Sequence, residues 1–101
     1  MTLYLVRHTH AGNRATWEGD DWLRPLSERG QAQARELVET LHHARFAHIV
    51  SSPYVRCMES VVPLAGAHML PIEPHDALAE GADVLDTLAL VARVAAEGAV
   101  L

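Results

Sequence analysis

Lysine is absent from this chain of 101 residues, and all eight basic side chains are arginine. The arginines form no run, and thirteen acidic residues give a formal net charge of −5. Nucleic acids and anionic membranes attract clustered positive charge, so neither is expected as a partner. Arginine can bind an oxyanion through two hydrogen bonds, although a GC-rich genome would explain the same bias toward arginine.

Cysteine is nearly absent as well, with Cys57 alone, and no apolar run approaches the roughly 20 residues of a membrane span. A single cysteine excludes an internal disulfide framework and fits a reducing compartment. The N-terminus lacks the basic and long apolar regions of a signal peptide. Half of the residues are apolar, and the length suits one domain. The sequence therefore predicts a soluble, cytoplasmic protein with a single domain over residues 1–101.

Strand and helix patterns alternate along the chain. Strand-forming runs occupy residues 2–6, 47–50, 69–73 and 99–101, and helical patterns begin at Ser27, Pro53 and Asp83. The expected inner helix faces are Ala34, Leu37, Val38 and Leu41, then Met58, Val61, Val62 and Ala65, then Leu85, Leu88, Ala92 and Ala95. Pro63 is expected to shorten or bend the second helix. This alternation predicts an α/β domain with a largely parallel sheet and right-handed crossovers.

Polar residues follow the first three strands, and the carboxyl ends of parallel strands meet at one edge of a sheet. Neutral imidazole is nucleophilic near pH 7, so His8, beside Arg7, is a candidate phosphoryl acceptor. Arg56, in the first turn of the second helix, could bind a phosphate together with backbone N–H groups. Glu80 could protonate a leaving group. Taken singly, an Arg-His pair is more often structural, and a lone glutamate is more often a solvated surface residue.

Four segments in order resemble the histidine phosphatase superfamily, which has the phosphoglycerate mutase-like fold. They are Leu5-Val6-Arg7-His8-Thr9-His10-Ala11, Pro25-Leu26-Ser27-Glu28-Arg29-Gly30-Gln31-Ala32-Gln33-Ala34, Val50-Ser51-Ser52-Pro53-Tyr54-Val55-Arg56-Cys57 and Leu78-Ala79-Glu80. The Gly-Asp-Asp-x-x-Arg-Pro-Leu run at residues 19–26 and the small size are similar to the bacterial phosphohistidine phosphatases. The resemblance implies a three-layer α/β/α domain.

The resemblance also implies a mechanism and a set of site residues. His8 would attack phosphorus and become a phosphohistidine, while Arg7 and Arg56 hold the phosphoryl oxygens. Glu80 would act as the general acid and later help to activate water, and Asn13 is expected near the phosphate. Neither a metal nor an organic cofactor is implied. The implied substrate is a phosphomonoester or a protein phosphohistidine.

Two features depart from the family pattern. Thr9 stands where the family usually has glycine, and a β-branched residue resists positive φ, so the loop geometry is expected to differ. The strand that would lead to the family's second pocket histidine begins at Ala99. The chain is therefore expected to be the N-terminal portion of the domain, truncated before that histidine, with its C-terminal part missing. A first strand near the middle of the sheet would then have an exposed edge, through which copies could associate. A non-catalytic phosphate-binding module and an inactive fragment are the open alternatives.

Overall fold

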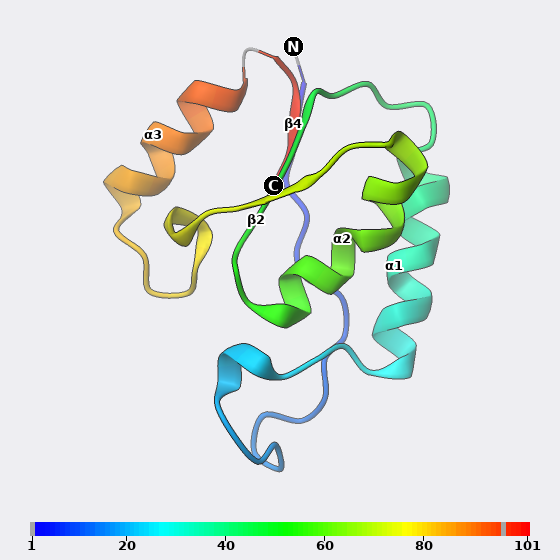
Figure 1. Cartoon of the computed structure of the whole chain (residues 1–101), viewed down its shortest axis with the longest axis vertical. Coiled ribbons are helices and arrows are strands. Elements are labelled where there is room, and N and C mark those ends of the chain that lie inside the picture. Colours follow the sequence, from blue (N-terminus) through cyan, green and yellow to red (C-terminus); the bar gives the residue numbers. More distant parts are fainter. Residues whose placement is uncertain (1, 96) are drawn as a thin grey trace.

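The computed structural model describes residues 2–95 and 97–101, which form a parallel sheet with helices between successive strands (Figure 1). The strands are β1 (Leu3–Tyr4), β2 (His48–Ser51), β3 (Ile72–Pro74) and β4 (Ala99–Val100), arranged in the order β1-β4-β2-β3. The α-helices are α1 (Glu28–Thr40), α2 (Val55–His68) and α3 (Val84–Ala95), and the short 3₁₀ helices are η1 (Asp21–Leu23) and η2 (Asp76–Leu78). No described helix combines the length and the apolar character that a bilayer crossing requires.

Helices cover both faces of the sheet. Ile49 and Val100 are buried in a cluster with residues of α1 and α2, whereas Val50 and Ala99 are buried in a cluster with α3 (Figure 1). Successive side chains of a strand point to opposite faces, so burial at consecutive positions places β2 and β4 between two helical layers. The expected three-layer α/β/α architecture with a mainly parallel sheet is confirmed.

The position of β1 agrees with the expected exposed edge. In the described residues β1 lies at one end of the sheet, so one of its edges has no partner strand there. A place for β1 near the middle of a complete domain's sheet stays a prediction. Ala99 is paired with both Leu3 and His48, so β4 separates β1 from β2. The pairing continues beyond the strand ends, where the Val6 N–H donates to the Leu101 carbonyl at 2.8 Å.

The start of α1 follows the sequence prediction. The Ser27 hydroxyl caps the helix by accepting the Gly30 N–H at 3.1 Å, which satisfies a donor that has no partner within the first turn. Ala34, on the predicted inner face, is 1% exposed. The capping residue and the apolar period therefore determine this helix locally.

Helix α2 differs from the prediction at its start. Tyr54 occupies the N-cap position, so Pro53 precedes the helix instead of lying in its first turn. Of the two effects expected of Pro63, shortening does not occur, because the helix continues to His68, and bending stays a prediction. A proline inside a helix costs about 3 kcal/mol, and burial of the neighbouring Leu64 side chain, at 0% exposure, offsets part of that cost.

The buried faces of α2 and α3 also differ from the prediction. The predicted inner residues that are exposed are Val62, Leu85, Leu88 and Ala92, whereas residues buried in their place are Leu64, Leu90 and Val94. Both helices carry apolar residues around most of their circumference, so the period alone does not select a face. In α3 a tertiary contact contributes to the choice, because the Thr87 hydroxyl donates to the Ala77 carbonyl of η2 at 2.6 Å.

Candidate active site

His8 follows β1 at the carboxyl edge of the sheet, and one hydrogen bond fixes its tautomer. Its Nδ1 lies 2.7 Å from the carbonyl oxygen of Thr9. A carbonyl oxygen can only accept a hydrogen bond, so Nδ1 carries the proton. In neutral imidazole, Nε2 then keeps its lone pair and can act as a nucleophile or an acceptor.

A cavity with a volume of about 560 Å³ lies beside His8. Its polar lining consists of Arg7, His8, Ser51, Ser52, Cys57, Ser60 and Thr87, and the rest of its lining is apolar. Arg7 is exposed and forms no ion pair with any other described residue. Its guanidinium is therefore available to an anion that enters this cavity.

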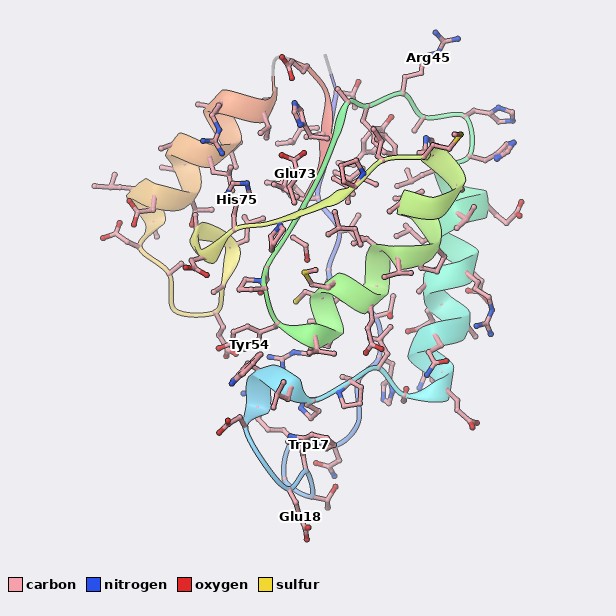
Figure 2. All side chains as sticks on the ribbon, in the orientation of Figure 1. Trp17, Glu18, Arg45, Tyr54, Glu73 and His75 are labelled. Carbon is pink, nitrogen blue, oxygen red and sulfur yellow. The ribbon has the colours of Figure 1, made fainter. Side chains whose placement is uncertain are left out.

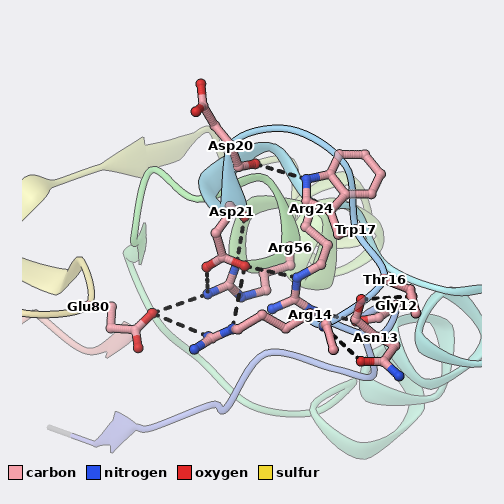
Figure 3. A network of polar contacts seen from close by, with 11 residues as sticks. Gly12, Asn13, Arg14, Thr16, Trp17, Asp20, Asp21, Arg24, Arg56 and Glu80 are labelled. Carbon is pink, nitrogen blue, oxygen red and sulfur yellow. Dashed lines mark hydrogen bonds and ion pairs between the residues drawn. The ribbon is translucent and has the colours of Figure 1, made fainter.

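Arg56 lies in the first turn of α2 and is 3% exposed. Its Nη1 donates to the Asp21 backbone carbonyl at 3.0 Å, and its Nη2 lies 3.2 Å from Asp21 Oδ2 and 3.4 Å from Glu80 Oε2 (Figure 3). The Tyr54 ring, between the start of α2 and η1, has its centroid 4.8 Å from the guanidinium carbon (Figure 2). The buried Nε of Arg56 has no hydrogen-bond partner within the described ranges. An anion reaching Nε would satisfy this donor.

Asp21 connects three arginines. Besides contacting Arg56, its Oδ1 lies 3.0 Å from Arg24 Nε and 3.5 Å from Arg14 Nε (Figure 3). The hydrogen bond from Arg24 is the largest cause that lowers the pKa of Asp21, while burial opposes it and the nearby guanidinium charges add to it. Asp21 is therefore an ionised counter-ion on η1. Arg14 also lies 3.5 Å from Glu80, so each of the two carboxylates contacts both Arg14 and Arg56.

Two hydrogen bonds connect the loop after His8 to the helix that carries Arg56. The Thr9 N–H donates to the Ser60 hydroxyl at 2.9 Å, and the Ser60 hydroxyl donates to the Arg56 carbonyl at 2.6 Å. This link joins backbone to backbone. No hydrogen bond or ion pair within the described ranges directly joins the His8 or Arg7 side chain to that of Arg56 or Glu80.

Comparison with known proteins assigns the sequence that carries these residues to a family. The model of the histidine phosphatase superfamily (branch 1) matches residues 3–87, which is most of the chain. The chain belongs to this superfamily. Its matched region contains Arg7, His8, Arg56 and Glu80, and stops inside α3.

The proteins that this chain resembles differ in their identity to it and in how much of their length it covers. The 8-oxo-(d)GTP phosphatase of Mycolicibacterium smegmatis is 42% identical over 64 residues, which are 63% of this chain and 20% of that protein. A structure from Agrobacterium tumefaciens, described as phosphohistidine phosphatase SixA, is 28% identical with a TM-score of 0.80, covering 97% of this chain and 64% of that one. A SixA structure complexed with tungstate has a TM-score of 0.84 at 20% identity, covering 99% and 67% respectively, and shares the fold. The chain thus spans less than two thirds of the first structure and a fifth of the curated relative.

The structure brings together some of the residues predicted for this superfamily site. Arg7 and His8 line one cavity, and Arg56 contacts Glu80. Within the described residues the Asn13 side chain makes no hydrogen bond to either group; its Oδ1 accepts the Ala15 N–H at 2.9 Å and stabilises a local turn. That side chain is thus engaged by its own loop, and a contact of Asn13 with phosphate stays a prediction.

The sequence marks Ser27, Gly30 and Gln33 only as parts of a motif and does not reveal that they hold the site. A Cβ on Gly30 would lie 1.9 Å from the His10 carbonyl oxygen, so only glycine allows α1 to approach this loop. Gln33 accepts the His10 N–H at 2.9 Å, and Ser27 donates to the His10 carbonyl at 3.0 Å. These residues explain part of the Pro25–Ala34 motif of the superfamily in physical terms. Thr9, which stands where the family usually has glycine, does not adopt a positive φ. Its hydroxyl donates to the Gly30 carbonyl at 2.8 Å.

Asp21 lies in the Gly-Asp-Asp-x-x-Arg-Pro-Leu run, but that run does not reveal its contact with Arg56. Arg14 was missed, because an exposed loop residue without a periodic pattern gives no signal by itself. The described residues contain no group of three or more histidine, cysteine, aspartate or glutamate side chains that could hold a metal ion.

Proposed function

We propose that this chain carries the nucleophile of a phosphatase that acts through a phosphohistidine intermediate on His8. The observation that carries the proposal is the contact between His8 Nδ1 and the Thr9 carbonyl oxygen. In the neutral imidazole this contact places the proton on Nδ1 and leaves a lone pair on Nε2, on a residue that lines a cavity. An imidazole oriented in this way at the carboxyl edge of a parallel sheet suits attack on phosphorus in its neutral form.

The two arginines would stabilise the negative charge of the transferred group. Arg7 forms no ion pair in the described part of the chain, and Arg56 has an unpartnered Nε–H. Guanidinium groups match phosphoryl oxygens, and their benefit grows where charge is greatest in the transition state. A phosphoryl oxygen at Arg56 Nη2 would compete with Glu80 Oε2, which lies 3.4 Å away.

In the first step, a bond forms between His8 Nε2 and phosphorus while the bond from phosphorus to the leaving oxygen breaks. The protonated Glu80 carboxyl gives its proton to that oxygen. In the second step, Glu80 takes a proton from water as the water oxygen attacks phosphorus. The P–Nε2 bond breaks, inorganic phosphate is released, and the His8 imidazole is restored.

The proposed substrate is a phosphomonoester or a protein phosphohistidine. Similarity to a SixA phosphohistidine phosphatase at 28% identity supports the second class, and similarity to an 8-oxo-(d)GTP phosphatase over 64 residues supports a small phosphorylated molecule. Both classes place a phosphoryl group on the same nucleophile, so one experiment addresses the shared chemistry.

The test is to trap the intermediate on the purified full-length protein. Brief incubation with a labelled phosphomonoester and alkaline quenching should leave an acid-labile adduct, which peptide mapping should place on His8. His43→Gln, which changes an exposed histidine in the turn after α1, is the matched control and should keep the adduct. An adduct on another residue, or turnover without an adduct in rapid-quench samples, would refute the proposal.

A further inference from the structure

The orientation of a buried guanidinium decides which of its N–H groups can meet a ligand. Arg56 is 3% exposed, and two of its three nitrogens are occupied by partners within the described ranges. Asp21 binds both of them, through its backbone carbonyl at Nη1 and its carboxylate at Nη2, at 3.0 and 3.2 Å. Two contacts from one residue restrict rotation of the guanidinium plane, as bidentate pairs do.

We propose that Asp21 is a positioning residue that fixes the Arg56 guanidinium so that its Nε–H, which has no partner among the described residues, is left for a bound oxyanion. The inference rests on the proposed function, because it assigns Arg56 to a phosphoryl group. Tyr54 supports the same orientation, since its ring centroid lies 4.8 Å from the guanidinium carbon and restricts movement on that side.

Asp21 can perform this role because it is held independently of Arg56. Arg24 is 6% exposed and binds Asp21 Oδ1 through Nε at 3.0 Å, while its Nη1 donates to the Gly12 carbonyl. Arg24 thus ties Asp21 to the loop before η1. A phosphoryl group that binds Arg56 therefore leaves Asp21 with a second, buried cationic partner.

Glu80 contacts the same guanidinium but is held differently. Its side chain is 59% exposed, and its two contacts, with Arg56 Nη2 and Arg14 Nη2, are 3.4 and 3.5 Å long. Both distances are long and the Glu80 carboxylate is largely solvated, so water screens these ion pairs, most of all the one with the exposed Arg14. Glu80 is thus the carboxylate that a phosphoryl oxygen can displace, and Asp21 is the one that stays.

Positioning of Arg56 by Asp21 and neutralisation of its charge by Asp21 have opposite effects on anion binding. A carboxylate beside Arg56 neutralises part of its charge, which by itself would weaken anion binding. If positioning dominates, removing the Asp21 charge weakens binding. If neutralisation dominates, removing it strengthens binding.

The measurement is the tungstate dissociation constant of the full-length protein by calorimetry. Asp21→Asn should raise it by roughly tenfold or more, as expected for loss of a charged hydrogen-bond partner. Asp21→Glu, which keeps the charge, should recover part of the loss. Asp20→Asn removes the same charge one residue earlier, from a side chain with no partner in the described part of the chain, and should change the constant by less than about twofold. An unchanged or lowered constant in Asp21→Asn would overturn the inference.

A double-mutant cycle separates positioning from a general structural role. In an Arg56→Ala background, Asp21→Asn should have little further effect on tungstate binding, because its route of action is gone. If the fold-changes in the tungstate dissociation constant caused by Asp21→Asn and Arg56→Ala multiply in the double variant, Asp21 acts independently of Arg56, and the inference is overturned. Thermal unfolding of each variant identifies any that fail to fold, and for these the cycle is repeated with the exposed Arg14→Gln in place of Asp21→Asn. Arg14→Gln removes the charge of one of the three arginines that contact Asp21. It should therefore weaken tungstate binding less than Asp21→Asn does, and only when Arg56 is present. Tungstate binding that depends on Asp21 without any adduct on His8 would refute the proposed function while leaving this inference intact.

Discussion

Arg7 and Arg56, the two arginines assigned to one phosphoryl group, are held in opposite ways. Arg7 is exposed at a cavity and forms no ion pair with a described residue, whereas Arg56 is buried between two carboxylates and an aromatic ring. Near Arg7, hydrogen bonds fix the backbone of the loop after β1, and the Arg7 side chain itself stays unpaired among the described residues. At Arg56, the carboxylates of Asp21 and Glu80 hold the guanidinium itself.

This difference indicates what each half of the site tolerates. The loop after β1 is fixed by hydrogen bonds to Ser60, Ser27 and Gln33 and by the close approach of Gly30, so its geometry depends on shape. The Arg56 half depends on the charge of Asp21 and Glu80. The variants below separate shape from charge, in decreasing order of expected effect.

His8→Gln should lower turnover of a phosphomonoester by at least about a thousandfold, because the amide cannot replace the imidazole as a nucleophile. The midpoint of unfolding should change little, since the ring makes a single hydrogen bond, to the adjacent residue. Steady-state kinetics and thermal unfolding of the full-length protein check both parts. Turnover close to that of the unchanged protein would remove His8 from the mechanism.

Gly30→Ala should destabilise the full-length protein by about 3 kcal/mol or more, because its Cβ would clash with the His10 backbone. Gly66→Ala is the matched control, since it lies within α2 and a Cβ there meets nothing within 4 Å. That substitution should stabilise by about 0.5–1 kcal/mol through helix propensity. Denaturant unfolding measures both, and a Gly30→Ala variant as stable as the unchanged protein would contradict the close approach.

Arg56→Ala and Arg7→Ala should both weaken tungstate binding by roughly tenfold or more, equivalent to about 1.5–3 kcal/mol. Only Arg56→Ala should also lower the midpoint of unfolding, because it removes a buried partner of Asp21 and Glu80. Calorimetry together with thermal unfolding distinguishes the two. Equal loss of stability in both variants would remove the contrast between the two arginines.

A pH series should reveal a charged cluster away from the proposed site. His48 contacts Glu73 of β3 at 2.8 Å and also Glu97, and these hydrogen bonds raise the pKa of His48 above 6.5 while burial opposes the shift. Its contribution to stability is therefore full below about pH 6.5 and is lost as pH rises through the raised pKa. The unfolding midpoint should fall over that range, and His48→Gln should flatten the slope.

Asp21 gives the opposite pH dependence. Its pKa lies below the usual 3.8, so its stabilising contribution is present above that value and is lost as pH falls through the lowered pKa. Asp21→Asn should therefore flatten the acid limb of the same unfolding series and leave the neutral limb unchanged. A change in the neutral limb would show that the two clusters are coupled.

The sequence by itself determined the order of elements, the parallel sheet and the capped start of α1. These follow from short-range causes, namely the apolar period and the Ser27 cap. Local pattern also identified His8, Arg7, Arg56 and Glu80 as candidates, since strand ends and a helix start place them at one edge of the sheet.

Only the tertiary structure decided the buried faces of α2 and α3, the pairing of β1 with β4, and the partners of Arg56. Helices that are apolar around most of their circumference offer several faces, and packing chooses among them. Asp21 contacts Arg56 across 35 residues of sequence. Contacts of that kind depend on where η1 and α2 meet in space, and no local period or capping preference encodes that meeting.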